Sequence, residues 1–266
     1  MKRLAVIGKD VSQSSSPQMH NFIAGNIGVE ITYDKLSISE EEFESRAEEL
    51  FAIYDGFNVT IPYKLTVIPH LKEVVGDARI FGSVNTVLTA TRQGFNTDGL
   101  GFELMLKNSG IEVNGANVLL LGGGGAGRSV AKKLIDGGAT VEVYDKNVGN
   151  AKNIEKEFVG VTAIDAVTAI KRDIIINATG VGMHKSVGIS PVGEDILRLC
   201  NSAVDLIYVP EKSEFLRLAE LNGKRIVNGM AMLFYQAYYA DCIYFNLTPS
   251  ASQARELFKK YSEEMK

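Results

Sequence analysis

A glycine run between an apolar stretch and a helical segment constrains the fold of this chain more than any other feature. The apolar stretch is Val118–Leu121, the run is Gly122–Gly127, and a helix is predicted over residues 128–136. A strand, a glycine-rich turn and a helix in this order open a dinucleotide-binding βαβ unit. The glycines allow a sharp turn, and the N–H groups at the helix N-terminus meet the charge of a pyrophosphate. We therefore predict a nucleotide site rather than a flexible loop, with these candidate residues: Gly122, Gly124, Gly125, Ala126 and Gly127.

An acidic residue at the end of the next predicted strand bears on the choice of cofactor. Asp145 follows the strand over residues 140–144. A carboxylate in this position accepts hydrogen bonds from a ribose 2′-hydroxyl and repels a 2′-phosphate, which favours NAD over NADP. Lys146 beside it offsets part of that charge and is a second candidate. The alternative is that Asp145 only caps the end of its strand.

Strand and helix patterns alternate along the whole chain, which predicts an α/β protein of two domains. Residues 173–177 and 203–207 are further uninterrupted apolar runs, of the kind that parallel sheets bury on both faces. They make the second half a Rossmann-like, doubly wound parallel sheet. We expect an α/β substrate-binding and catalytic domain over residues 1–100 plus about 240–266. The nucleotide-binding domain takes residues 101–239, and the last helix packs back on the first domain.

Two local signals mark helix starts in the first half. Ser16 is predicted as an N-cap with Pro17 at the first helical position, where its missing N–H costs nothing. Ser39–Glu42 has the pattern of a capping box. The acidic run that follows is typical of a solvated helix face.

Composition excludes several classes of function. The net charge of −4 offers no basic field for a nucleic acid. Cys200 and Cys242 are the only cysteines, which fits buried thiols in a reducing compartment. The three histidines have no metal-ligand spacing, so we predict no metal. No apolar run is long enough for a membrane span or a signal peptide, and we expect a cytoplasmic monomer or homodimer.

Polar side chains gather at strand ends and loops of the first half. They occupy Ser14–Pro17, Asn58–Lys64, Asn85–Thr86 and Asn96–Asp98. Ligands of open α/β sheets bind beyond the carboxyl ends of the strands, where hydroxyls and amides can hold a polyhydroxylated ring. Spacing alone does not show that these segments converge.

The order of these segments resembles the shikimate dehydrogenase family over nearly the whole chain. The matching motifs are S-x-S-P at Ser14–Pro17, N-V-T-x-P-x-K at Asn58–Lys64, V-N-T at Val84–Thr86, N-T-D-G at Asn96–Gly99, the glycine loop Gly122–Arg128, N-A-T-x-x-G-M at Asn177–Met183, and the closing helix at Asn228–Leu233 with Gln236 and Ala237. The resemblance implies reversible NAD(P)H-dependent reduction of 3-dehydroshikimate to shikimate, on the route to chorismate and the aromatic amino acids.

The resemblance also implies a role for each matching residue. Lys64 and Asp98 form the catalytic pair. The candidates for substrate binding are Ser14, Ser16 and Thr60 for the carboxylate, and Asn58, Asn85, Asp98, Tyr208 and Gln236 for the rest of the ring. Thr179 and Gly229 join the cofactor candidates, Gly229 by leaving room for the nicotinamide.

Chemistry supports the catalytic pair, although several candidate residues, taken singly, also have a purely structural interpretation. Reduction of a ketone builds negative charge on oxygen, which a nearby ammonium stabilises and protonates. Taken singly, Lys64 could be a solvated lysine, Ser16 a helix cap, Asn85 a turn residue, and Gln236 a solvated helix residue. Gly229 could simply break a helix.

Departures from the family pattern leave the cofactor and the substrate open. Gln13 replaces a usual histidine, Gly180 a usual serine, and Ser213–Glu214 a usual T-P. Tyr144–Asn147 lacks the arginine that serves the 2′-phosphate in NADP-dependent members. An NAD-dependent quinate or dual quinate/shikimate dehydrogenase is therefore the second candidate. Further alternatives are a non-catalytic nucleotide- and metabolite-binding regulator, and an enzyme of the methylene-tetrahydrofolate dehydrogenase or glutamyl-tRNA reductase type.

Overall fold

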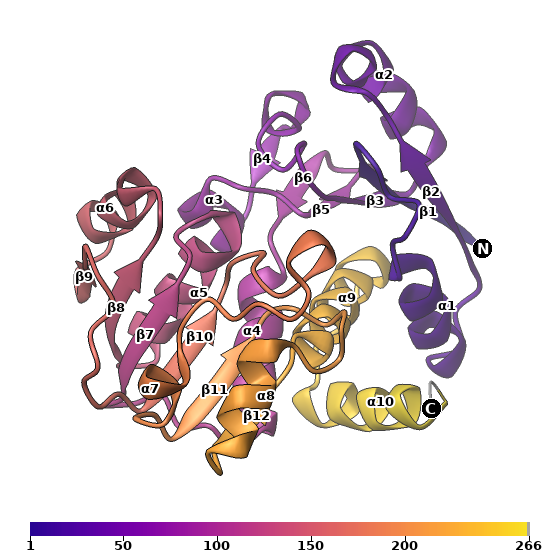
Figure 1. The fold of residues 1–266 in the computed structure, drawn as a ribbon. Helices are drawn as coiled ribbons and strands as arrows, with labels where there is room; N and C mark the ends of the chain where they lie inside the picture. Colours follow the sequence, from indigo (N-terminus) through magenta and orange to yellow (C-terminus); the bar gives the residue numbers. More distant parts are fainter. Residues whose placement is uncertain (265–266) are drawn as a thin grey trace. The chain divides into compact units, whose positions relative to one another are not determined.

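The computed structural model describes residues 1–264, and its chain divides into two compact units. The first unit combines residues 1–101 with the segment from Phe234 onward, and the second is Phe102–Leu233. Both boundaries fall inside helices, α4 (Asp98–Asn108) and α9 (Met230–Phe245) (Figure 1). The sequence placed them at residues 100/101 and about 239/240, and no signal in it marks a break inside a continuous helix.

The first unit contains a six-stranded mixed sheet in the order β2-β1-β3-β5-β6-β4. Its strands are β1 (Lys2–Gly8), β2 (Ile31–Ser37), β3 (Gly56–Val59), β4 (Glu73–Val74), β5 (Thr86–Leu88) and β6 (Gln93–Phe95). Strand β1 pairs in parallel with β2 and β3, and β5 is antiparallel to β3 and β6. The helices of this unit, besides the shared α4 and α9, are α1 (Ser16–Asn26), α2 (Glu40–Ile53), η1 (Ile68–His70), α3 (Asp77–Phe81) and α10 (Ala251–Glu264).

Strand β1 is buried on both faces, which explains its uninterrupted apolar sequence. Ala5 and Ile7 face a cluster that includes residues of α2 and β3, whereas Leu4 and Val6 face a cluster with residues of β2 and α9. All four side chains are almost fully buried. Each large one contributes about 1.5–3 kcal/mol relative to exposure, so the core spans both sides of this strand.

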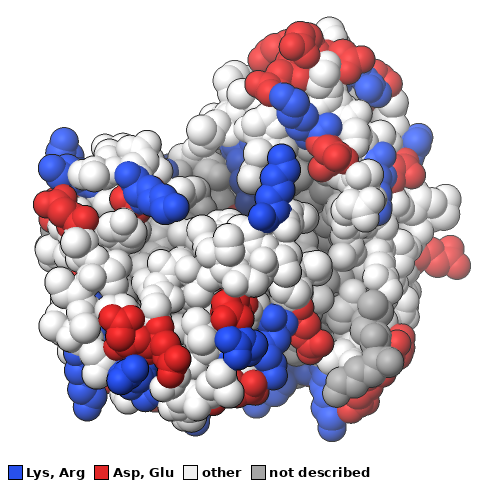
Figure 2. All heavy atoms as spheres, in the orientation of Figure 1, with Lys and Arg blue, Asp and Glu red and all other residues white. Residues whose placement is uncertain are grey.

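Helix α2 begins at the predicted capping box. The Ser39 hydroxyl accepts a hydrogen bond from the Glu42 N–H, and the Glu42 carboxylate accepts one from the Ser39 N–H. Phe43, Ala47 and Leu50 form its buried face. Figure 2 shows acidic side chains gathered over this helix, at the top of the view.

The second unit is a parallel six-stranded sheet in the order β12-β11-β10-β7-β8-β9. Its strands are β7 (Asn117–Leu121), β8 (Thr140–Tyr144), β9 (Val161–Ala163), β10 (Ile174–Asn177), β11 (Ser202–Asp205) and β12 (Arg225–Val227). Its helices are α5 (Gly125–Asp136), α6 (Val148–Glu157), η2 (His184–Ser186), α7 (Glu194–Leu197) and α8 (Glu214–Leu221). This is the strand order of the dinucleotide-binding fold. The α/β, Rossmann-like prediction is confirmed.

Several predicted boundaries were wrong by a few residues. Helix α5 begins at Gly125 rather than at Arg128, and α4 begins at Asp98, whereas the sequence predicts this helix only over residues 101–108. Strand β11 ends at Asp205 rather than Ile207. The N-cap of α1 is Ser15, not Ser16, because the Ser14 hydroxyl accepts from the Ser16 N–H and shifts the helix start.

The C-terminal helix packs on the first unit as predicted. The Tyr261 ring on α10 lies 5.2 Å from the Phe22 ring on α1 and 5.1 Å from Phe234 on α9. Within residues 1–264, every helix is too short or too polar to cross a bilayer.

Candidate active site

A lysine and an aspartate form an ion pair in the first unit. Lys64 Nζ donates to Asp98 Oδ2 over 2.6 Å, with 28% of the lysine side chain and 17% of the aspartate side chain exposed. Lys64 lies in the turn after β3, and Asp98 is the first residue of α4. The pair is thus partly desolvated yet open to solvent, so a small molecule can reach the ammonium.

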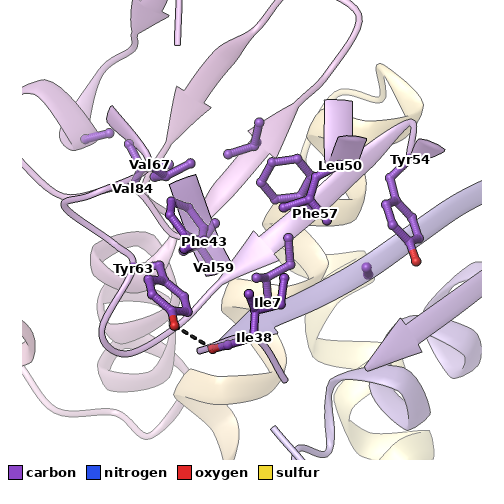
Figure 3. Close-up of a cluster of buried hydrophobic side chains, with 13 residues drawn as sticks. Ile7, Ile38, Phe43, Leu50, Tyr54, Phe57, Val59, Tyr63, Val67 and Val84 are labelled. Carbon is purple, nitrogen blue, oxygen red and sulfur yellow. Dashed lines mark hydrogen bonds between the residues drawn. The ribbon is translucent and has the colours of Figure 1, made fainter. Parts of the chain in front are cut away.

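The turn that carries Lys64 is anchored by its neighbour Tyr63. The Tyr63 ring stacks on Phe43 at 4.3 Å, and its hydroxyl donates to the Ile38 carbonyl over 2.5 Å (Figure 3). The Lys64 carbonyl accepts from the Val84 N–H over 2.8 Å. Buried packing on one side and a main-chain bond on the other therefore hold Lys64 in place.

Asn85 joins the ion pair to two further polar residues. Its amide nitrogen lies 2.8 Å from Asp98 Oδ1, 3.1 Å from Thr97 Oγ1 and 3.4 Å from Gln236 Oε1. Its amide oxygen accepts from the Thr97 N–H over 3.0 Å. The predicted group Lys64, Asn85, Asp98 and Gln236 thus converges, although the four residues are far apart in sequence.

The two serines of the first motif also lie together. The Ser14 hydroxyl donates to Ser16 Oγ over 3.1 Å. Both residues are partly exposed, as is Thr60, whose N–H donates to the Ile7 carbonyl at the end of β1. The three hydroxyls therefore belong to residues that an anionic group can reach.

Asn58 lies beneath this site rather than on its surface. The residue is 6% exposed. Its amide nitrogen donates to the Asn85 carbonyl and to Thr86 Oγ1, both over 3.2 Å, and its amide oxygen accepts from the Tyr33 hydroxyl over 2.7 Å. These bonds use both donors of Asn58, so its amide supports the residues around the site.

In the second unit, the glycine loop lies where the strand order reverses. Strand β7 has β8 on one side and β10 on the other, and Leu121 at its end pairs with Asn177. The first N–H groups of α5 have no partner within the helix, and Gly124, Gly125 and Ala126 around its start are exposed. Ligands of doubly wound sheets bind at this switch point.

Gly127 has no room for a side chain. A Cβ there would lie 2.0 Å from the Gly122 carbonyl oxygen, far inside van der Waals contact. Close packing of helix against strand is the function of the third glycine in a dinucleotide-binding loop. The loop therefore fits a nicotinamide dinucleotide both in its position and in its packing.

Asp145 closes the side of this loop. Its carboxylate accepts from the Gly123 N–H over 2.7 Å and from the Asn147 N–H over 2.8 Å, with Asn150 Nδ2 at 3.3 Å. Partial burial acts to raise the pKa of Asp145, but these hydrogen bonds outweigh it and lower the pKa below its ordinary value. Asp145 is thus an anion fixed beside the glycine loop, with the exposed Lys146 next to it.

Two buried side chains organise the neighbouring strand ends. Asn177 Oδ1 accepts from the Thr179 N–H and hydroxyl, and Asn177 Nδ2 donates to Asp205 Oδ1. Asp205 also accepts from the Ile207 N–H and the Ser213 hydroxyl. Burial raises the pKa of Asp205 to about 6, although these hydrogen bonds act to lower it.

Tyr208 and Gly229 belong to the same region of the second unit. Tyr208 is partly exposed three residues after the end of β11, and the Gly229 N–H donates to the Ile207 carbonyl over 3.0 Å. A Cβ on Gly229 would lie 2.0 Å from the Leu206 carbonyl oxygen. Backbone packing therefore requires a glycine at position 229. This reason differs from the alternative that Gly229 simply breaks a helix.

The structure divides the predicted site residues between the units. The first unit holds Ser14, Ser16, Asn58, Thr60, Lys64, Asn85, Asp98 and Gln236. The second holds Tyr208 and the cofactor candidates Gly122, Gly124, Gly125, Ala126, Gly127, Asp145, Lys146, Thr179 and Gly229.

Sequence reasoning missed Tyr33 and Asp205. Asp205 ends a buried parallel strand, a position that indicates ligand-proximal polar groups, and this signal could have found it. Tyr33 lies in mid-strand between Thr32 and Asp34, and nothing in its spacing separates it from an ordinary buried tyrosine.

Comparison with known proteins finds relatives that cover both halves of the chain. The sequence model of the shikimate dehydrogenase substrate binding domain matches residues 6–87. The shikimate dehydrogenase (NADP(+)) of Thermus thermophilus is 35% identical over 98% of both chains, and that of Pyrococcus abyssi is 35% identical over 97% of both. The crystal structure of the Thermus enzyme with NADP(H) and shikimate superposes with a TM-score of 0.88, at 35% identity over 98% of this chain and 99% of that one.

Proposed function

The chain belongs to the shikimate dehydrogenase family, and from that premise we propose that it interconverts 3-dehydroshikimate and shikimate with a nicotinamide cofactor. The observation that carries the proposal is the Lys64–Asp98 pair, 2.6 Å apart and joined to Asn85. A non-catalytic regulator has no need of a proton donor fixed in this way. The cofactor supplies hydride to the ring carbonyl, and the protein supplies the proton and the orientation.

Lys64 is the proton donor in the proposed reaction. The ketone oxygen gains negative charge during reduction, and the Lys64 ammonium stabilises that charge and transfers a proton to it. Asp98 holds the ammonium at the correct end of the site and keeps its positive charge paired. In the reverse direction, neutral Lys64 accepts the proton from the substrate hydroxyl.

Substrate orientation is assigned to the polar residues around this pair. Ser14, Ser16 and Thr60 hold the carboxylate through their hydroxyls, while Asn85, Asp98 and Gln236 bind ring hydroxyls. Asn58 supports these residues by donating hydrogen bonds to the Asn85 carbonyl and to Thr86 Oγ1. Tyr208 is a further candidate for contact with the substrate.

The cofactor is assigned to the switch point of the second unit. The N–H groups at the start of α5 would bind the pyrophosphate, and Thr179 and Gly229 would lie beside the nicotinamide. Free, buried Cys200 and Cys242 support a cytoplasmic location, where thiols stay reduced.

We propose that NAD is preferred to NADP. Asp145 is a fixed anion beside the glycine loop, and the residues that follow it, Lys146 and Asn147, include no arginine. A ribose 2′-hydroxyl can donate to this carboxylate, whereas a 2′-phosphate is repelled by it. The relatives compared above have NADP(+) in their names, so this preference sets the present chain apart from them.

Turnover of shikimate and quinate, with NAD and NADP in parallel, tests the reaction. Lys64→Met is expected to lower kcat by about 10²- to 10⁴-fold, the usual value of general acid catalysis. Lys72→Met, an exposed lysine in the same unit, is the matched control and is expected to keep full activity. Turnover of quinate alone would favour the second candidate, and folded protein that binds cofactor without turning over either acid would favour a regulator.

The cofactor preference has its own test. Asp145→Ser is expected to lower kcat/KM with NAD and raise it with NADP, moving the ratio by at least about 10-fold, since one hydrogen bond to a charged group contributes about 1.5–3 kcal/mol. Asp165→Ser removes an exposed aspartate of the same unit and serves as the control. A wild-type preference for NADP would refute the proposed role of Asp145.

A further inference from the structure

A chain of hydrogen bonds joins Tyr33 to the catalytic pair, although none of the family motifs contains this tyrosine. It lies on β2, on the face of the first sheet where Leu4 and Val6 of β1 point. Asn58 on β3 is opposite Val6, so its side chain points to the same face. Strand β1 lies between β2 and β3, and the Tyr33 ring spans it to place its hydroxyl 2.7 Å from Asn58 Oδ1.

The Tyr33 ring is held rigidly in this position. It is 9% exposed, and it stacks on the His20 ring with 4.5 Å between centroids and an interplanar angle of 15°. His20 is itself fixed by Asp241, 2.6 Å away. The ring therefore has little freedom left to lose when the substrate binds, and its hydroxyl is a preorganised group.

The Tyr33 hydroxyl donates to the buried amide oxygen of Asn58. Burial raises the pKa of Tyr33 well above its ordinary value, so the phenol keeps its proton. From Asn58 the chain continues through Thr86 Oγ1 to Asn85 Oδ1, with donor–acceptor distances of 3.2 and 2.8 Å.

This chain ends on the catalytic pair. The Asn85 amide donates to Asp98 Oδ1 over 2.8 Å, and Lys64 donates to the other oxygen of the same carboxylate. Donors therefore run in one direction from Tyr33 to Asp98. Hydrogen bonds in such a chain polarise one another in a low-dielectric interior, and the terminal carboxylate is the group that orients them.

We propose that Tyr33 is a positioning residue for the reaction, which holds the Asn58–Asn85–Asp98 network in place. The proposal rests on the proposed function of the site. Without the phenol oxygen, the buried amide oxygen of Asn58 loses its donor. This loss loosens Asn85 and, through it, Asp98.

Tyr33→Phe tests the proposal because it removes one oxygen and keeps the stacked ring. We expect kcat/KM for shikimate to fall by about 10-fold or more, which is the loss of about 1.4 kcal/mol or more of hydrogen bonding. The loss should fall mainly on kcat, because the hydrogen-bond chain ends on Asp98. The affinity for the nicotinamide cofactor should stay unchanged, since the chain lies wholly in the first unit.

Tyr54→Phe is the matched control. Tyr54 is also a buried tyrosine of the first unit, and its hydroxyl donates to Asp34 over 2.9 Å, outside the chain. It should lose stability comparable to Tyr33→Phe and keep its kcat/KM. Equal kinetic losses in the two variants would mean that Tyr33 has only a structural role, and they would overturn the proposal.

A double variant separates positioning from general loosening. In an Asn58→Ala background, Tyr33→Phe should lower kcat no further, because Asn58 is the residue through which Tyr33 acts on Asp98. Independent, additive effects on kcat would contradict that coupling. Absence of wild-type turnover would refute the proposed function itself, whereas normal wild-type turnover with an unaffected Tyr33→Phe variant would refute this inference alone.

Discussion

At the scale of single residues, the second unit buries the carboxylate of Asp205 in its interior. Asp205 is fully buried at the end of β11 and accepts hydrogen bonds from Asn177, Ile207 and Ser213. Those bonds tie three segments together, and the segments carry the cofactor candidate Thr179 and the substrate candidate Tyr208. The elevated pKa of Asp205, about 6, records the cost of burying its charge.

The unfolding free energy should therefore depend on pH through Asp205. An unfolded aspartate titrates near 3.9, so between about pH 4 and pH 6 the folded protein holds a proton that the unfolded chain has lost. Stability from this group is thus present at low pH and falls as pH rises to about 6, by up to about 3 kcal/mol. Asp205→Asn stays neutral, and denaturant unfolding from about pH 4 to pH 7 should show its stability gaining on that of the wild type.

Asp195→Asn is the control for that comparison. Asp195 is an exposed aspartate of the same unit, and its substitution should change the pH dependence by less than about 0.5 kcal/mol. A constant stability difference between Asp205→Asn and the wild type over the whole range would mean that Asp205 ionises as freely in the folded protein as in the unfolded chain.

Residues carried by a contiguous motif could be predicted, and residues that act through space could not. Lys64 and Asp98 were predicted from motifs, and they lie 2.6 Å apart. Tyr33 reaches Asn58 across β1, a contact that depends on strand order and on which face each side chain takes. Neither fact follows from the local sequence around Tyr33, because β2 and β3 do not follow each other in the sheet.

At the scale of elements, the turn from β7 to α5 depends on one glycine for its packing. Gly127→Ala would bring a methyl group to 2.0 Å from the Gly122 carbonyl oxygen. The backbone of the loop must shift to relieve this clash, at a cost of about 1–3 kcal/mol. We expect a lower unfolding free energy and at least about 10-fold weaker cofactor binding, measured by denaturant unfolding and by nicotinamide fluorescence titration.

Gly124→Ala distinguishes packing from loss of flexibility. A Cβ on Gly124 meets no atom within 4 Å, and its φ of −71° suits any residue. The unfolding free energy should therefore change by less than about 0.5 kcal/mol. If both substitutions destabilised the protein equally, the clash with Gly122 would not be the reason that position 127 requires glycine.

Element types were predictable from periodicity, whereas several element ends depend on tertiary contacts. The capping box at Ser39 was located because both of its partners lie within one turn of helix. Glycines hid the true starts of α4 and α5, since a glycine in a first helical turn costs little when the turn packs against a sheet. The helix α1 starts where the Ser14 hydroxyl, outside the helix, accepts from its first residue.

At the scale of the whole molecule, the first unit is built from both ends of the chain. His20 on α1 and Asp241 on α9 are buried, and their side chains lie 2.6 Å apart although 221 residues separate them. Burial raises the pKa of Asp241, while His20 acts to lower it. A polar pair in this position specifies which faces of α1 and α9 meet, because a shifted register would leave both groups unpaired.

Removing one partner of this pair should therefore lower the unfolding free energy more than replacing both partners. Asp241→Ala leaves His20 buried without its partner and should lower the unfolding free energy by about 3–5 kcal/mol. The double variant His20→Phe with Asp241→Leu removes both polar groups and keeps an aromatic ring against Tyr33. It should recover most of that loss, since replacing a whole buried pair by apolar residues is often neutral. Denaturant unfolding of the three proteins measures this, and a double variant less stable than Asp241→Ala would show that the pair contributes net stability beyond its own burial cost.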